Sequence, residues 1–324
     1  MEPILKVRDL HTEIKMDYGT FEAVSGVSFD LGKGETLGLV GESGCGKSLT
    51  SLSLTGLLGP KVRVAAGEAW FEGKDILHVS EAEKRELRGG KISMIFQEPM
   101  TALNPLFTIG NQMVEMMLPH MKITKKDALK RAVELLSDMG IERPEQIVKS
   151  YPFQLSGGML QRVMIAMSLS CNPRILIADE PTTALDVTIQ AQILKLMNEL
   201  KTKYDTSIIL ITHNLGVVAQ ICDRVAVMYF GQIVETAGVK ELFENPRHPY
   251  TKGLMGCIPK LDEDEELLNT IPGMVPAVTE HIQGCSFAPR CPLCTERCRT
   301  AMPELGEIAP GHACRCWQAM EEKA

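Results

Sequence analysis

One eight-residue segment combines glycines with a lysine and a serine at a spacing suited to phosphate. GESGCGKS (residues 41–48) follows an apolar run and precedes a helix-forming stretch. Glycines let backbone N–H groups wrap an anion, and the following helix directs its positive end at it. Lys47 would neutralise the outer phosphates of a nucleotide and Ser48 would bind Mg²⁺. The alternative is a chance glycine turn. Contacts with the nucleotide are expected from Gly41, Ser43, Gly44, Cys45, Gly46, Lys47, Ser48 and Leu49.

Two adjacent carboxylates, Asp179 and Glu180, stand at the end of the apolar run RILIAD. A strand ending there would carry Asp179 toward Mg²⁺ and its water shell. Glu180 could polarise a water for in-line attack on the terminal phosphate. The alternative is an acidic pair that is merely solvated at a strand end.

Thiols crowd into the C-terminal part of the chain, between residues 285 and 316. A cytosolic setting disfavours disulfides there, which leaves a metal as the better reason for the clustering. Four thiolates suit either zinc or a [4Fe–4S] cluster. The Cys-x-x-Cys pair at 291 and 294 suits zinc, with Cys314 and Cys316 as a second pair. The spacing alone leaves both metals open, with free thiols as a third possibility. The clustered residues are Cys285, Cys291, Cys294, Cys298, Cys314 and Cys316.

Three short apolar runs predict the strands that position these groups: TLGLV at 36–40, RILIAD at 174–179 and SIILIT at 207–212. Unbroken runs of this length are typical of strands covered by helices on both faces. We therefore expect an α/β fold with parallel pairing, in which each strand ends where a polar motif begins.

The chain between about residues 100 and 170 loses its strand signal and favours helix. Thr124 can cap a helix that Gly140 would end. Its apolar face would consist of Ala128, Ala132, Leu135, Leu136 and Met139. Farther on, two strands of a hairpin are predicted at RVAVMYF (224–230) and IVE (233–235). The segment 244–249 is predicted to break the regular structure and 262–266 to form a solvated linker. Beyond about residue 270 we expect a loop-rich tail.

Composition excludes several classes of protein. The 324 residues provide room for about two domains. Lys and Arg number 34 against 41 Asp and Glu, a net charge of -7, so no global basic field exists to hold nucleic acid. No apolar run approaches the roughly 18 residues that span a bilayer, and MEPILKVRDL lacks the features of a secretory signal. We expect a cytosolic chain that is at most peripheral to a membrane.

LSGGMLQR (155–162), taken with the phosphate loop and ILIADEP, resembles the signature motifs of the ATP-binding-cassette (ABC) ATPases. This resemblance implies a P-loop ATPase core with an antiparallel β subdomain and an α-helical subdomain at about 100–170. It also implies that Ser156 and Gly158 contact the γ-phosphate of ATP held by the opposite subunit of a dimer. Met159 stands where the family usually has Gln, so a side-chain hydrogen bond from that position is absent.

The same resemblance implies roles for residues whose types alone decide little. Gln97 matches the loop that senses Mg²⁺ and water, and Asp186 matches the loop between subunits. His213 matches the switch histidine on the γ-phosphate, and Tyr18 the ring that stacks on adenine. An ordinary surface or packing role is the alternative for each. The resemblance thus gives Glu180, His213 and Gln97 as catalytic residues and Ser48, Gln97 and Asp179 as ligands of Mg²⁺.

A narrower resemblance rests on MIFQEPMTALNP, NPRHPYTKGLM, IPGMVP and GCSFAPRCP, which look like segments of oligopeptide/dipeptide importer ATPases of the peptide/nickel type. It implies a nucleotide-binding domain over 1–240 and a C-terminal extension with a Cys-rich site over 241–324. It also implies a [4Fe–4S] cluster, with Cys294 and Cys314 as spare thiols. The implied ligands are Cys285, Cys291, Cys298 and Cys316.

The partners that this narrower resemblance implies are a second, similar ATPase, two membrane permeases and an extracytoplasmic substrate-binding protein. The chain would then work at the cytoplasmic face of the membrane in peptide uptake. Nickel or another small solute could be the substrate instead of peptide. Three further functions compete with peptide import: a non-transport ABC ATPase, an exporter subunit, and a redox or zinc regulator.

Overall fold

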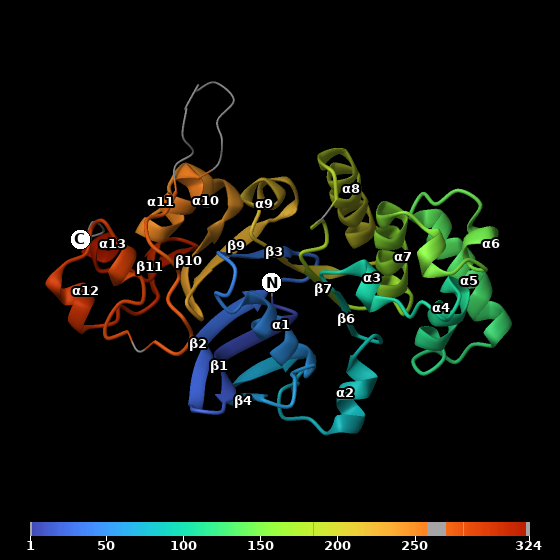
Figure 1. The fold of residues 1–324 in the computed structure, drawn as a ribbon, viewed down its shortest axis with the longest axis horizontal. Helices are drawn as coiled ribbons and strands as arrows, with labels where there is room; N and C mark the ends of the chain where they lie inside the picture. The colour runs from blue at the N-terminus through green and yellow to red at the C-terminus, as the bar shows by residue number, and fades with distance from the viewer. Residues whose placement is uncertain (1, 184, 258–269, 281, 322–324) are drawn as a thin grey trace. The chain divides into compact units, whose positions relative to one another are not determined.

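The structure, a computed structural model, describes residues 2–183, 185–257, 270–280 and 282–321. The chain forms two compact units, one of Met1–His78 with Ile211–Ala324 and one of Val79–Leu210. Figure 1 shows the ribbon coloured from the N-terminus to the C-terminus. The predicted linker at 262–266 lies outside the described residues.

The first unit contains an antiparallel sheet in the order β2-β1-β4-β5. Leu5, Val7 and Leu10 of β1 face the core, and a register shift between Val7 and Leu10 interrupts the two-residue alternation of the strand. Thr12 on β1 hydrogen-bonds Ser53 on the first helix at 2.8 Å, which ties this sheet to the phosphate-loop helix. The strands are β1 (Leu5–Met16), β2 (Gly19–Leu31), β4 (Val62–Phe71) and β5 (Lys74–Asp75).

A second set of strands in the first unit has the order β11-β12-β10-β9-β3. Strand β3 (Thr36–Val40) is buried throughout and runs parallel to β9 (Arg224–Tyr229). Strand β9 continues into β10 (Gln232–Gly238) as the predicted antiparallel hairpin. The helices of this unit are α1 (Lys47–Thr55), α9 (Leu215–Ile221), α10 (Val239–Glu244), α11 (Pro249–Gly256), α12 (Glu296–Thr300) and α13 (Trp317–Glu321), with a 3₁₀ turn η2 (Ala288–Arg290).

The C-terminal tail is more regular than its composition predicts. Strand β12 (His312–Cys314) pairs with β10, and β11 (Gly306–Ala309) pairs with β12. These strands cover an edge of β10 that would otherwise expose unpaired backbone groups. Because each has only three or four residues, neither produced an alternating pattern in the sequence.

The second unit holds β6 (Ile92–Ile95) parallel to β7 (Ile175–Asp179), and β8 (Ser207–Thr212) begins in it. The predicted strands at 36–40, 174–179 and 207–212 are thereby confirmed, with β7 starting one residue later. Helices α4 to α7 pack on one another in this unit (Figure 1). Its helices are α2 (Glu81–Leu87), α3 (Pro99–Ala102), α4 (Ile109–Met117), α5 (Lys125–Asp138), α6 (Pro144–Ile147), α7 (Gly157–Leu169) and α8 (Val187–Lys203), with η1 (Pro152–Gln154).

Helix α5 follows its sequence signals closely. The Thr124 side chain accepts a hydrogen bond from the Asp127 N–H at its start, and Gly140 has a φ of 67° beyond its end. The predicted apolar face, including Ala128, Ala132 and Leu136, is buried. Together with the sheets, this confirms the α/β fold class. Within the described residues, no helix is both long and apolar enough to cross a membrane.

Candidate functional site

The phosphate-loop segment, residues 41–48, connects β3 to α1 in the first unit. Gly46 precedes α1 with a φ of 101°, and a Cβ there would lie 2.8 Å from the Ala23 carbonyl oxygen. Gly41 has a φ of 154°, and a Cβ there would collide with the Met228 carbonyl oxygen. Only glycine fits such positions. The loop is therefore held tightly between β2 and β9.

Lys47 is buried at the start of α1, whereas Ser43, Gly44 and Ser48 are exposed. The Lys47 Nζ donates to the Gly41 and Glu42 carbonyl oxygens at 2.8 and 2.9 Å and lies 3.6 Å from the Cys45 Sγ. Burial raises the pKa of the Cys45 thiol, which keeps it neutral. An ammonium held by neutral acceptors can exchange them for phosphate oxygens, which accept stronger, charge-assisted bonds.

Tyr18 and His213 also belong to the first unit. Tyr18 lies in the turn between β1 and β2, is 74% exposed, and has its ring centroid 5.6 Å from that of Phe21. A ring this exposed can stack on a base. His213 follows β8 and is exposed. The Asn214 side chain behind it caps α9 by accepting from the Gly216 N–H at 2.9 Å, which fixes the backbone next to the imidazole.

In the second unit, Gln97 and Glu180 lie together. Gln97 Nε2 donates to Glu180 Oε2 at 3.5 Å, and the Thr183 hydroxyl donates to the same oxygen at 2.7 Å. Glu180 has a left-handed φ of 48°, a conformation that costs energy in a residue with a side chain. Asp179 precedes it at the buried end of β7. The two carboxylates thus lie in different environments, Asp179 buried and Glu180 partly exposed.

Two loops of the second unit end in capped helices. The Ser156 side chain accepts from the Met159 N–H at the start of α7, and the Asp186 side chain accepts from the Ile189 N–H at 3.0 Å at the start of α8. Ser156 is exposed, so the N-terminal end of α7 is open to solvent. A Cβ on Gly158 would lie 3.3 Å from the Ile189 side chain. The backbone N–H groups at an exposed helix N-terminus can bind an anion.

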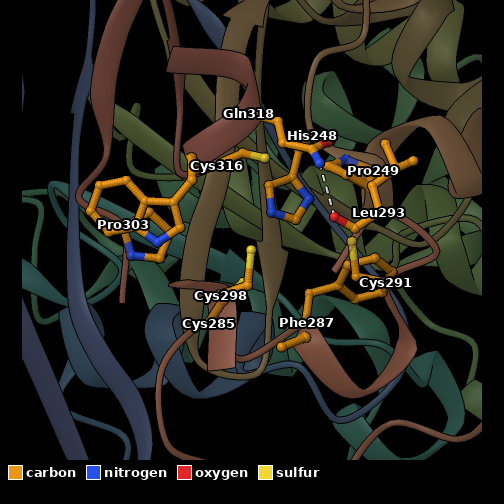
Figure 2. A pocket seen from close by; sticks show the side chains of 12 residues that line it. His248, Pro249, Cys285, Phe287, Cys291, Leu293, Cys298, Pro303, Cys316 and Gln318 are labelled. Carbon is orange, nitrogen blue, oxygen red and sulfur yellow. Dashed lines mark hydrogen bonds between the residues drawn. The ribbon is translucent and has the colours of Figure 1, made fainter. Parts of the chain in front are cut away.

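Four thiols of the tail, Cys285, Cys291, Cys298 and Cys316, line one small cavity of about 10 Å³ (Figure 2). Burial raises the pKa of Cys285 and Cys316, and raises that of Cys291 to about 11; the neighbouring thiols add to each shift. Thiolates at such positions need a cation to stabilise them. Cys294 and Cys314 do not line this cavity.

The expected metal site is not present as a ready cage for one ion. Among the described residues, no group of three or more His, Cys, Asp or Glu side chains is arranged to hold a metal ion. The four thiols share a cavity without converging on a single point. A sequence pattern of thiols predicts only donor type, whereas ligand geometry depends on how the loops of the tail fold.

Sequence reasoning did not single out Glu42 of the phosphate loop, nor Arg290 and Tyr250, the two residues that hold it from outside the loop. The Glu42 side chain pairs with Arg290, and the Glu42 backbone N–H donates to the Tyr250 hydroxyl. No local spacing could have revealed this cluster, because Glu42 and Arg290 are 248 positions apart.

Comparison with known families agrees with this geometry. Residues 24–183 match the family described as ABC transporter. Residues 234–298 match the family described as the oligopeptide/dipeptide transporter, C-terminal region.

Curated relatives match the whole chain. It is 52% identical over 325 residues to the oligopeptide transport ATP-binding protein AppD of Bacillus subtilis (strain 168), covering 100% of this chain and 99% of that one. It is 52% identical over 318 residues to the dipeptide transport ATP-binding protein DppD of the same organism, covering 98% and 95%.

Solved structures match the larger part of the chain. The dimeric, post-hydrolysis ATP-binding cassette MJ0796 bound to ADP and Pi aligns with a TM-score of 0.65 at 26% identity, covering 72% of this chain and 98% of that one. The cbiO1 protein of Clostridium perfringens, part of the cbiONQ transporter complex, aligns with a TM-score of 0.64 at 29% identity, covering 76% and 92%.

Proposed function

The chain belongs to the ATP-binding subunits of ABC transporters, in the group with the oligopeptide/dipeptide C-terminal region, and from this we propose that it hydrolyses ATP to drive peptide uptake. The observation that carries the proposal is the match over the entire chain to oligopeptide and dipeptide transport ATP-binding proteins. The contact of Lys47 with Gly41 in the phosphate loop and the contact between Gln97 and Glu180 support the proposal that the chain hydrolyses ATP.

In this proposal the chain's residues divide the work of one ATP site. Lys47 and the loop amides bind the β- and γ-phosphates, and Tyr18 stacks on adenine. Ser48, Gln97 and Asp179 offer oxygen ligands of the kind that Mg²⁺ prefers, and the metal would neutralise phosphate charge. Glu180 accepts the proton of the attacking water, while His213 and Gln97 orient the γ-phosphate and that water.

The site is completed by a second subunit. Ser156 and Gly158 lie at an exposed helix end, which suits contact with the γ-phosphate of ATP bound to a partner. The related cassette MJ0796 was solved as a dimer. We therefore propose that this chain pairs with a second, similar ATPase and lies against two membrane permeases at the cytoplasmic face, with an extracytoplasmic protein delivering the substrate.

Purification of the intact complex tests the substrate assignment. Mass spectrometry of what its binding protein carries should identify peptides, and adding those peptides should stimulate ATP hydrolysis by the complex. The matched complex with Glu180→Gln should bind the same peptides without the stimulation. A binding protein loaded with nickel instead would overturn the peptide assignment and leave the ATPase assignment standing.

For the tail we propose that Cys285, Cys291, Cys298 and Cys316 hold a [4Fe–4S] cluster with a structural role. All four line one cavity, and each thiolate of such a cluster binds a different iron, so the sulfurs need not converge on one point. Zinc requires that convergence. Filling the site would bind together a tail with few apolar residues.

The cluster has a direct spectroscopic test. Anaerobically purified protein should be brown, with broad absorbance near roughly 400 nm and about four irons per chain. Cys298→Ser should lose the iron, while Cys294→Ser, outside the cavity, should retain it. Colourless protein with stoichiometric zinc would refute the cluster.

A further inference from the structure

Glu42 is an acidic residue inside the loop that binds phosphate. The loop spans residues 41–48, so its carboxylate lies within roughly one Debye length, about 10 Å at 0.1 M salt, of any anion held there. An uncompensated carboxylate at that distance would repel the triphosphate. Neutralising this charge and directing it away from the loop would therefore favour binding of the anion.

Arg290 of the Cys-rich tail supplies the neutralising charge. Its Nη1 donates to Glu42 Oε2 at 2.7 Å and its Nη2 donates to Oε1 at 3.1 Å, a two-point pairing. The Arg290 side chain is only 4% exposed and that of Glu42 is 29% exposed. A bidentate pair with one buried partner is stronger and more directional than a fully exposed ion pair.

The guanidinium is itself fixed by the tail. Its Nε donates to the Pro272 carbonyl at 3.0 Å, its Nη2 donates to the Ile271 carbonyl at 3.3 Å, and it lies 5.8 Å from the centre of the Tyr229 ring. The position of the Glu42 carboxylate is therefore set by Arg290, which Ile271 and Pro272 hold, as well as by the loop.

A second contact holds the backbone of Glu42. The Glu42 N–H donates to the Tyr250 hydroxyl at 2.8 Å. The ring of Tyr250 is buried, and its centroid lies 4.7 Å from that of Tyr229 and 5.5 Å from that of Phe287. The Glu42 carbonyl accepts from Lys47 Nζ at 2.9 Å. Displacing Glu42 would thus displace the acceptor that positions the phosphate-binding lysine.

We propose that Arg290 is a positioning residue of the ATP site that acts through Glu42. It cancels the charge of Glu42 and holds the loop in the shape that presents Lys47 and the amides to phosphate. The inference rests on the proposed function and assigns part of the ATP affinity to the C-terminal tail.

The test is a charge cycle in the full-length chain, with ATP affinity measured at equilibrium. Arg290→Met leaves Glu42 unpaired and should weaken ATP binding on the order of tenfold or more. The double variant Glu42→Gln/Arg290→Met has no unpaired charge and should recover to within about threefold of the parent. If Arg290 served only to pack the tail, the double variant would bind ATP as weakly as Arg290→Met.

The salt dependence of ATP affinity distinguishes electrostatic repulsion by Glu42 from a change in the shape of the loop. The deficit of Arg290→Met should shrink as ionic strength rises, because salt screens the repulsion between Glu42 and phosphate. The matched control is Arg297→Met, a tail arginine that stacks on Trp317 and pairs with Glu321. It should bind ATP like the parent at every salt concentration.

Folding and the ATPase assignment are controlled separately. If Arg290→Met fails to fold, Arg290→Lys replaces it, because lysine keeps the positive charge but cannot form the two-point pairing; its ATP affinity should be intermediate. Parental ATP affinity in whichever variant folds would overturn the inference. If Lys47→Ala abolishes ATP binding while Arg290→Met binds normally, this inference alone fails. If the parent chain binds no ATP, the proposed function fails.

Discussion

At the scale of single residues, we propose that Lys47 supplies the charge that binds the outer phosphates. It is buried, and its ammonium is held by the loop carbonyls and near the neutral Cys45 thiol. Lys47→Ala should abolish ATP binding, since loop amides alone would have to hold a highly charged triphosphate. Equilibrium binding measures this directly, and unchanged affinity would disprove the phosphate-loop assignment.

Glu180 is expected to act on water rather than on ATP affinity. Glu180→Gln keeps the shape and the contact with Gln97 but removes the proton acceptor. ATP should bind as before while turnover falls on the order of 10²-fold or more. Paired binding and hydrolysis assays distinguish the two effects, and hydrolysis at the parental rate would eliminate this role.

At the scale of elements, the pairing of β1 with β2 includes a titratable contact. His11 hydrogen-bonds Glu22 and Asp9. Burial lowers the pKa of His11, but the hydrogen bonds and charges of Glu22 and Asp9 outweigh it and raise the pKa above 6.5. The contact therefore stabilises the fold fully below pH 6.5, and the stabilisation is lost as the pH rises through the folded-state pKa.

The predicted consequence is a pH-dependent mutational effect. His11→Gln should lower the denaturation midpoint more at pH 6 than at pH 9, and Glu22→Gln should lower the His11 titration midpoint seen by NMR. Equal destabilisation by His11→Gln at both pH values would show that the imidazolium charge is not involved.

Elements with local signals were predictable and those with long-range causes were not. A capping threonine predicts the α5 helix, and an unbroken apolar run predicts the β3 strand. Strand β12 pairs with β10 about 80 residues earlier, and its three residues carry no pattern. The same limit hid the pairing of Glu42 with Arg290, whose separation of 248 positions only the folded chain removes.

The candidate site likewise contains residues that local spacing predicts and contacts that it does not. Sequence spacing was enough to make Lys47 and Glu180 candidates, because the loop and the strand end position them locally. It could not predict that Thr183 and Gln97 share one oxygen of Glu180, or that four of the clustered thiols line a single cavity. Those facts depend on loop conformations and packing.

At the scale of the whole molecule, the proposed catalytic unit contains two chains. Ser156 and Gly158 would serve the ATP of the partner, while Lys47 and Glu180 serve this chain's own. The isolated chain at low concentration should therefore show little ATPase activity, rising with concentration as dimers form. Full activity at dilutions where light scattering detects only monomer would contradict the shared site.

The most direct test of the whole account is ATP-driven transport in proteoliposomes that contain the complete complex. With the binding protein outside and ATP inside, labelled peptide should accumulate in the lumen, and Glu180→Gln in this subunit should reduce the rate at least about tenfold. Accumulation that is independent of ATP, or ATP-driven movement of peptide outward, would contradict the assignment of this chain as the ATPase of a peptide importer.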